Sequence, residues 1–300
     1  MTATNDTGVA PKARPTNLTG TPSAIPHGAV SARSRSLKRF YSNLQRHQLS
    51  HGLMRTDGGG IDTPYSDADL LRNFEKITFF DEYPTGGGRD SRYGIHQNVL
   101  RKWAGPVRFS VEFGPSVPPD VQAKYHATVV SFVARLARIT GHPMSVTAEN
   151  PNFFVLFVNE DERPLVMNRL YSIHPNFNAT TAEVIQNLPK KVHCLAVSFG
   201  GQTFANTLQN TVVLIRTEQP ELNQLACVHE ELSQGLGLPN DSSQARPSIF
   251  NDDSEFALLT THDEELLRLL YNPALSPGMS IEQARPILTR LIRQRHSGGT

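Results

Sequence analysis

The chain has 300 residues, of which 38% are hydrophobic and 19% are charged, and its formal net charge is +1. This balance is typical of a globular protein with one large domain or two modest ones, and two cysteines are too few for a disulfide-framework protein. The longest apolar runs, such as residues 153–158, are much shorter than the roughly 20 residues of a spanning helix, so we expect no transmembrane segment.

The N-terminal part of the chain is basic, and the rest is mildly acidic. Residues 1–60 contain eight lysine and arginine residues and two aspartates, so the remaining residues carry a net charge of −5. A basic leader could contact anionic lipid or nucleic acid, but neither an aromatic stacking pattern nor a nucleic-acid motif accompanies these charges. We therefore expect a solvated arm and no nucleic-acid partner.

Composition divides the chain into three parts. Residues 1–31 are rich in small and polar side chains, which indicates a disordered leader or tether. The first 15 residues lack the apolar segment of an export signal, so we expect a protein that is cytoplasmic or that begins after a removed signal. Residues 32–60 are predicted to form a basic amphipathic helix that packs on the body of the protein, followed by a linker. Residues 61–300 are predicted to form one domain.

Within this domain, predicted helices and strands alternate. Ser66 is expected to cap a helix, and a glycine-containing loop follows it. Hydrophobic periodicity predicts a long helix over residues 118–143, with strands over residues 106–114, 152–161, 191–200 and 210–218. This order indicates a layered α/β or α+β fold with a small mixed sheet and C-terminal helices. The glycine clusters match no nucleotide-binding fingerprint.

The run HEELSQGLGLPND, residues 229–241, is similar to the active-site helix of a zinc metalloprotease. Such a helix presents His-Glu-x-x-His, but the fifth position here is Ser233, which is a poor zinc ligand. The apolar stripe of the predicted helix places His229 near the core. The polar face is centred on Glu230 and Gln234.

A longer zinc-protease pattern fits when it begins at Glu230. It then aligns Glu231 with the catalytic glutamate and Gly237 with the glycine that ends the helix in a left-handed conformation. The positions of the three histidines, and the position after them, are occupied by Glu230, Gln234, Asn240 and Asp241. Neutral amides are weak zinc ligands in comparison with imidazole and thiolate, so we do not expect zinc.

The sequence after this helix follows the order of a metzincin-type zincin. Such proteins continue to a tight Ser-Ile-Met turn under the metal, and then to a helix that opens with Leu-Thr-x-x-Asp and ends with Leu-Tyr. The turn corresponds here to Ser248, Ile249 and Phe250, and the helix to residues 259–271. We expect Phe250 to replace the methionine as an apolar plug.

Asp263 lies in the first turn of that last helix, where Thr261 and Glu264 fit a capping box. An acid at this place is explained by the helix dipole without any catalysis. We therefore assign a structural role to Asp263, as to Gly237 and the turn.

Several separated runs resemble a bacterial family of lipoproteins and exported proteins that is described as a domain of unknown function. These runs include EELSQGLGLPND, SIFNDD, LLRLLYNPALSPGM, GPVRFSVEFG, RLARITGHP and FVLFVNEDER, and they cover roughly residues 50–280. Membership would imply a location in the periplasm or cell envelope, which is oxidising. In that compartment Cys194 and Cys227 could form a disulfide, and two ordinary buried thiols are the alternative.

Three interpretations of the site remain open. In the first, a zincin-like scaffold without hydrolytic activity binds an extended peptide or an envelope protein by strand addition beside its cleft. In the second, the protein is a hydrolase with Glu231 as general base. It uses two carboxylates alone, or it holds calcium or manganese on residues among Glu230, Glu231, Asn240 and Asp241. In the third, Gln234 and Asn240 only hydrogen-bond the turn. Adjacent glutamates are by default an exposed helix face.

Overall fold

The structure is a computed structural model, and it describes residues 30–80, 98–175, 177, 179–200, 206–251 and 253–295. The disordered leader predicted for residues 1–31 lies almost wholly outside these ranges, and so does the glycine-containing loop predicted after the first helix of the domain. Within the described ranges, no helix combines the length and the apolar character that crossing a membrane requires.

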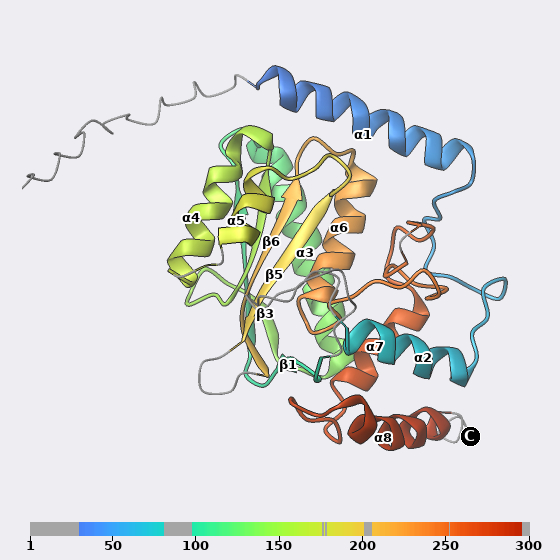
Figure 1. The fold of residues 1–300 in the computed structure, drawn as a ribbon. Helices are drawn as coiled ribbons and strands as arrows, with labels where there is room; N and C mark the ends of the chain where they lie inside the picture. Colours follow the sequence, from blue (N-terminus) through green and yellow to red (C-terminus); the bar gives the residue numbers. More distant parts are fainter. Residues whose placement is uncertain are drawn as a thin grey trace, which may run out of the picture.

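A six-stranded sheet of the described residues lies at the centre of the molecule (Figure 1). Its strands are β1 (Lys102–Trp103), β2 (Val107–Phe113), β3 (Met144–Val146), β4 (Phe153–Val158), β5 (Cys194–Gly200) and β6 (Thr207–Arg216). They follow the order β1-β6-β4-β2-β3, and β5 also pairs with β6. Every pairing is parallel except that of β5 with β6, which is antiparallel. The predicted mixed, layered α/β fold is thus confirmed.

Helices cover both faces of this sheet (Figure 1). One face carries α3 (Pro119–Thr140) and α6 (Glu221–Gln234), and α2 (Asp67–Thr78), α7 (Thr261–Leu270) and α8 (Ile281–Gln294) share their core. The other face carries α4 (Arg163–Ile173) and α5 (Ala179–Gln186), and a 3-10 turn, Glu160–Glu162, precedes α4. The sequence patterns predict no helix over residues 163–186, so α4 and α5 are found only in the structure.

The central strand β4 separates two hydrophobic cores. Phe153, Val155 and Phe157 belong to the core formed with α3 and α6, whereas Phe154 and Leu156 belong to the core formed with α4 and α5. Successive side chains of a strand point to opposite faces, so an uninterrupted apolar run is what a strand between two helical layers needs. This explains why residues 153–158 show no alternation in the sequence.

Local sequence signals fix the ends of the predicted helices. Ser66 caps α2 through a capping box with Asp69, as the sequence predicts. Pro119 occupies the first position of α3, and Gly141 ends that helix with a φ of +65°. These boundaries place α3 along the sheet, directly against the helix that carries the motif.

The N-terminal helix α1 (Ala32–Ser50) packs on the body of the protein, as predicted from its amphipathic pattern. Tyr41 is fully buried, and its hydroxyl donates a hydrogen bond to the Lys190 carbonyl at 2.8 Å. The Ser34 hydroxyl donates to the Glu218 carboxylate at 2.6 Å. The helix is therefore anchored by specific buried polar contacts as well as by its apolar face.

An ion network is buried where α1 meets the sheet. Arg216, at the end of β6, pairs with Glu160 at 2.7 Å and also donates to the Leu188 carbonyl at 2.8 Å. Arg163 pairs with the same glutamate at 2.7 Å. Removing a charge from water costs several kcal/mol, so a buried charge needs ion-pair and hydrogen-bond partners such as these.

Candidate functional site

The motif helix α6 packs against α3 on one side and against β5 and β6 on the other. Of its predicted apolar stripe, Val228 and Leu232 on the helix and Leu236 just after it are fully buried, whereas Leu225 is half-buried. On its polar side, Glu230 and Gln234 remain half-buried. The site must therefore be built from that side of the helix.

His229, the first residue of the apparent His-Glu motif, is a core residue. Its ring stacks on Phe132 with centroids 4.1 Å apart, and its Nδ1 accepts the Leu259 backbone N–H at 2.9 Å. Burial lowers the pKa of His229 to about 3. The position near the core predicted from helical spacing is confirmed, and the imidazole is neutral at physiological pH.

The buried His229 predicts a loss of stability in mild acid. Its folded pKa lies below the value of 6.5 of an unfolded chain, so on acidification the unfolded state takes up the proton first. Stability contributed by neutral His229 is complete above pH 6.5 and falls as the pH drops toward 3. Between pH 6.5 and 5 we expect a loss of about 2 kcal/mol in the free energy of unfolding.

Urea denaturation at several pH values measures this loss. His229→Asn keeps an acceptor for the Leu259 N–H, so it should be less stable at pH 7 but should lack this part of the acid slope. His126→Asn, at an exposed position of α3, should keep the whole slope. An acid slope in His229→Asn as steep as in the parent chain would contradict the assignment.

The two glutamates of the motif do not form an exposed helix face. Glu231 is only 4% exposed and Glu230 is half-buried, so that default expectation is wrong. A carboxylate oxygen of each lies within 4.8 Å of the other and of the Cys194 sulfur. The physical reason is tertiary: the first residue of β5 lies against this face of α6 and shields it.

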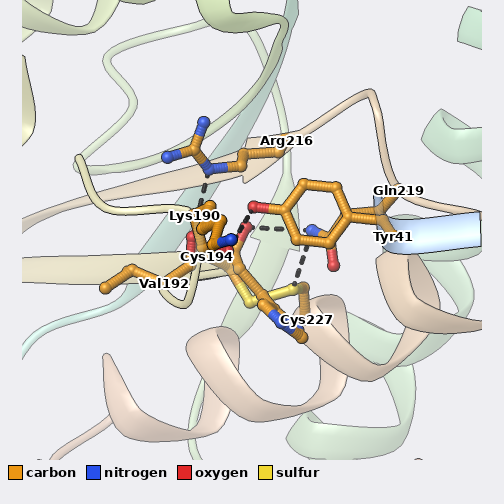
Figure 2. The surroundings of a disulfide bond; sticks show 8 residues. Tyr41, Lys190, Val192, Cys194, Arg216, Gln219 and Cys227 are labelled. Carbon is orange, nitrogen blue, oxygen red and sulfur yellow. Dashed lines mark hydrogen bonds between the residues drawn. A yellow bond between two sulfur atoms is a disulfide. The ribbon is translucent and has the colours of Figure 1, made fainter. Parts of the chain in front are cut away.

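A disulfide between Cys194 and Cys227 holds β5 against α6 (Figure 2). The two Cα atoms are 5.9 Å apart, within the ordinary range for such a bond. The side-chain Nε2 of Gln219 donates a hydrogen bond to the His193 carbonyl at 2.9 Å. The same nitrogen lies 3.5 Å from the Cys227 sulfur. Of the two alternatives that the sequence leaves open, the structure therefore has the disulfide.

The other predicted ligand residues form hydrogen bonds with different partners. Gln234 donates from Nε2 to the Asp241 carboxylate at 3.1 Å. Asn240 instead donates from Nδ2 to the Lys76 carbonyl at 2.9 Å, and its backbone N–H donates to the Ile77 carbonyl at 3.2 Å. The asparagine thus fastens the chain after α6 to the last turn of α2, and not to the turn that the structural interpretation expects.

Glycines allow the chain to turn sharply after α6. Gly237 has a φ of +121°, and a Cβ there would lie 2.3 Å from the Arg101 carbonyl oxygen, so the predicted glycine turn is confirmed. Sequence reasoning missed Gly235, where a Cβ would lie 2.6 Å from the Phe153 ring. The Trp103 indole N–H donates to the Gly235 carbonyl at 2.8 Å, so the end of the helix is closely packed.

Asp263 organises the turn that follows. Its fully buried carboxylate accepts from the Ser248 hydroxyl at 2.5 Å and from the Ile249 N–H at 3.0 Å. It also accepts from the Thr260 N–H and hydroxyl at 2.9 and 2.8 Å. Phe250 is fully buried in the core shared with α6, as expected of an apolar plug. The structural roles predicted for the turn and for Asp263 agree with these contacts.

The capping box predicted for α7 is wrong by one residue. Thr260, not Thr261, is the N-cap, and Asp263, not Glu264, is its partner. Thr260 has an extended backbone, with φ −86° and ψ 169°, so its hydroxyl reaches the Asp263 N–H, whereas Thr261 is already helical. The same aspartate therefore caps the helix and holds the turn.

The donor set of this site suits oxygen-bound ions better than zinc. Among the residues that the structure describes, only Cys194, Glu230 and Glu231 form a group of three or more histidine, cysteine and acidic ligands. The disulfide leaves Cys194 without a thiolate, so two carboxylates remain, fewer than the three protein ligands of a catalytic zinc. Calcium or manganese would need further oxygen ligands beside this pair.

Comparison with known proteins gives a family but no function. A family model described as "Protein of unknown function (DUF2927)" matches residues 67–290. No curated protein and no solved structure matches the chain. The matched range holds all the described strands and the motif helix, and α1 lies outside it. Because the match covers more than half of the sequence, the chain belongs to the DUF2927 family of proteins of unknown function.

Proposed function

We propose that this chain is a zincin-like protein without hydrolytic activity, which binds an extended peptide or protein segment along β5 in the bacterial cell envelope. The observation that carries this proposal is the position of β5 (Figure 1). Among the described residues it pairs with β6 alone, and residues 195–199 are half-buried rather than covered. An edge strand of this kind is where strand addition takes place.

The zincin-like part of the proposal is supported by what surrounds the end of α6. Gly237 turns the chain, and the Ser248–Phe250 turn packs in the same core as the helix. At the end of α7, the Tyr271 hydroxyl donates to the Leu236 carbonyl at 2.9 Å. Two of the sequence features shared with metzincins, the glycine and the final tyrosine, thus lie at the end of α6, and the turn packs in the same core.

The acidic pair gives the proposed binding edge its chemical character. Glu230 and Glu231 lie beside the Cys194 end of β5, as the distances to the cysteine sulfur show. A carboxylate pair at one end of a strand favours a segment with a lysine or arginine at the matching position. Main-chain hydrogen bonds would supply affinity, and this charge would set the register.

The alternative function is a hydrolase in which Glu231 is the general base. It is favoured by one observation, the burial of Glu231 next to a second carboxylate. Two such groups can exchange protons without a metal, or can hold an oxygen-preferring ion such as calcium or manganese. In this case peptide would be bound and also cleaved.

Binding of a hexapeptide library to the full chain tests the proposal. We expect basic peptides to bind, and N-methylation of alternate backbone amides to weaken the best peptide at least about tenfold, because it removes strand hydrogen bonds. Glu230→Gln, at the half-buried member of the pair, should weaken basic peptides more than neutral ones. Glu221→Gln, an exposed position on the same helix, should change neither.

Metal analysis of protein purified without chelator separates the two functions. Stoichiometric zinc, calcium or manganese, or peptide cleavage that Glu231→Gln abolishes, would favour the hydrolase. Equal binding of methylated and unmethylated peptides would rule out strand addition.

A further inference from the structure

A hollow of about 360 Å³ lies on the face of the sheet opposite α6. We call it the β2–α4 hollow. It is lined by the ends of two strands and by one helix, with Glu112 and Phe113 from β2, Leu156 and Val158 from β4, and Leu165 and Arg169 from α4. None of these residues belongs to the site at the end of α6.

The hollow exists because the helices cover this face only in part. The core beneath α4 and α5 contains Phe154, Leu156 and Leu214 from β4 and β6, and no residue of β2. The β2 side chains that point to this face, Ser110 and Glu112, are therefore half-exposed. Ligands of open α/β sheets bind outside the carboxyl ends of parallel strands, and these are the ends that line the hollow.

One wall of the hollow carries a fixed pair of opposite charges. Arg169 donates to Glu112 from Nη2 at 2.6 Å and from Nε at 3.3 Å. Its guanidinium lies over the Phe154 ring, 4.8 Å from the centroid, which limits its freedom. The two side chains remain 35% and 29% exposed, so both can contact a ligand.

The rest of the lining is apolar. Leu156 and Val158 form part of the wall, and Leu165, which is 40% exposed, adds an apolar surface that a ligand can cover. A volume of this size is at the lower end for small-molecule sites, which run from about 300 Å³ upward. The hollow therefore suits a small ligand with one short apolar group.

We propose that the β2–α4 hollow binds a free α-amino acid with an aliphatic side chain. The ligand carboxylate accepts from Arg169, its ammonium group donates to Glu112, and its side chain covers Leu165. Two adjacent charges of opposite sign select a zwitterion, because a simple anion would meet the glutamate and a simple cation would meet the arginine. This site is independent of peptide binding along β5.

Titration of the full chain with L-leucine, followed by calorimetry, tests the proposal. N-acetyl-L-leucine and L-leucine amide each lack one charge, and each should bind at least about tenfold more weakly than leucine. Glycine, which has no aliphatic group, should also bind more weakly. These three comparisons examine the carboxylate, the ammonium group and the apolar wall separately.

Substitutions inside and outside the hollow test where leucine binds. Asn168→Phe fills the hollow from an exposed position of α4 and leaves the ion pair intact, so it should weaken leucine binding at least about tenfold without unfolding the chain. Arg169→Gln should do the same. Arg268→Gln, an exposed ion-paired arginine on α7, should bind leucine like the parent chain.

Three results would overturn this proposal. They are the absence of leucine binding at about 20 mM, equal binding of leucine and N-acetyl-leucine, and unchanged binding in Asn168→Phe.

Discussion

Replacement of Asp263 by asparagine is expected to lower the free energy of unfolding by about 3–5 kcal/mol. The fully buried carboxylate accepts four hydrogen bonds, from the Ser248 and Thr260 hydroxyls and from two backbone N–H groups. An amide has one oxygen and a donating nitrogen, so at least one buried donor would lose its partner. Urea denaturation at pH 7 measures the loss.

Asp69→Asn is the matched control. Asp69 has the same place in the capping box of α2, where its partner is Ser66, but its side chain is 36% exposed and holds no turn. Its replacement should cost about 1 kcal/mol or less. Similar losses in the two variants would mean that Asp263 acts only as a helix cap.

Removal of the disulfide, by Cys194→Ala with Cys227→Ala, is expected to cost about 3–4 kcal/mol. The two cysteines are 33 residues apart, and the unfolded chain gains the entropy of opening this loop. Hydrogen exchange should show a second, local effect: the amides of β5 nearest Cys194 should exchange faster, because that end of the strand is no longer tied to α6.

The parent chain under reductant provides the control for this variant. Its denaturation midpoint should fall to that of the double variant, and reductant should leave the variant unchanged. A parent chain with the same midpoint in both conditions would show that the bond adds no stability. A variant that still exchanges slowly at the start of β5 would show that packing alone fixes this edge.

The register of the motif was predictable because it depends on local geometry. Helical spacing alone places His229 near the core, and a glycine after a helix end predicts the positive φ of Gly237. The turn and the apolar plug follow from their order along the chain. These features need no knowledge of which elements lie side by side.

The burial of Glu231 could not be predicted in this way, because it depends on β5, a strand from another part of the chain. The contact of Asn240 with the end of α2 is tertiary for the same reason. Gly235 carries no local signal, since its φ is ordinary and only the Phe153 ring requires the missing side chain. The spacing of residues in the sequence describes one helix or strand at a time, whereas each of these contacts joins two elements that lie far apart in the chain.

The helix α4 was missed although its start has a signal. Asn159 and Glu162 form a capping box just before it, and Pro164 lies in its first turn. Its buried side chains, Val166, Met167 and Leu170, follow the helical spacing, but the apolar residues Leu165 and Tyr171 are exposed. These exposed apolar residues hide the helical period in the sequence, and Leu165 also lies at the wall of the β2–α4 hollow.

The helix α1 lies outside the range that the family model matches, but it packs on residues inside that range. Similarity to the family begins at residue 67, yet Ser34 and Tyr41 are buried among residues of the matched region. A fragment cut at residue 67 would expose the Glu218 carboxylate and the Glu160–Arg216 pair to water, and would strip the aromatic cover from Lys190. We therefore expect a fragment that begins at residue 67 to unfold at a lower urea concentration than the full chain, because the contacts of α1 stabilise the matched region.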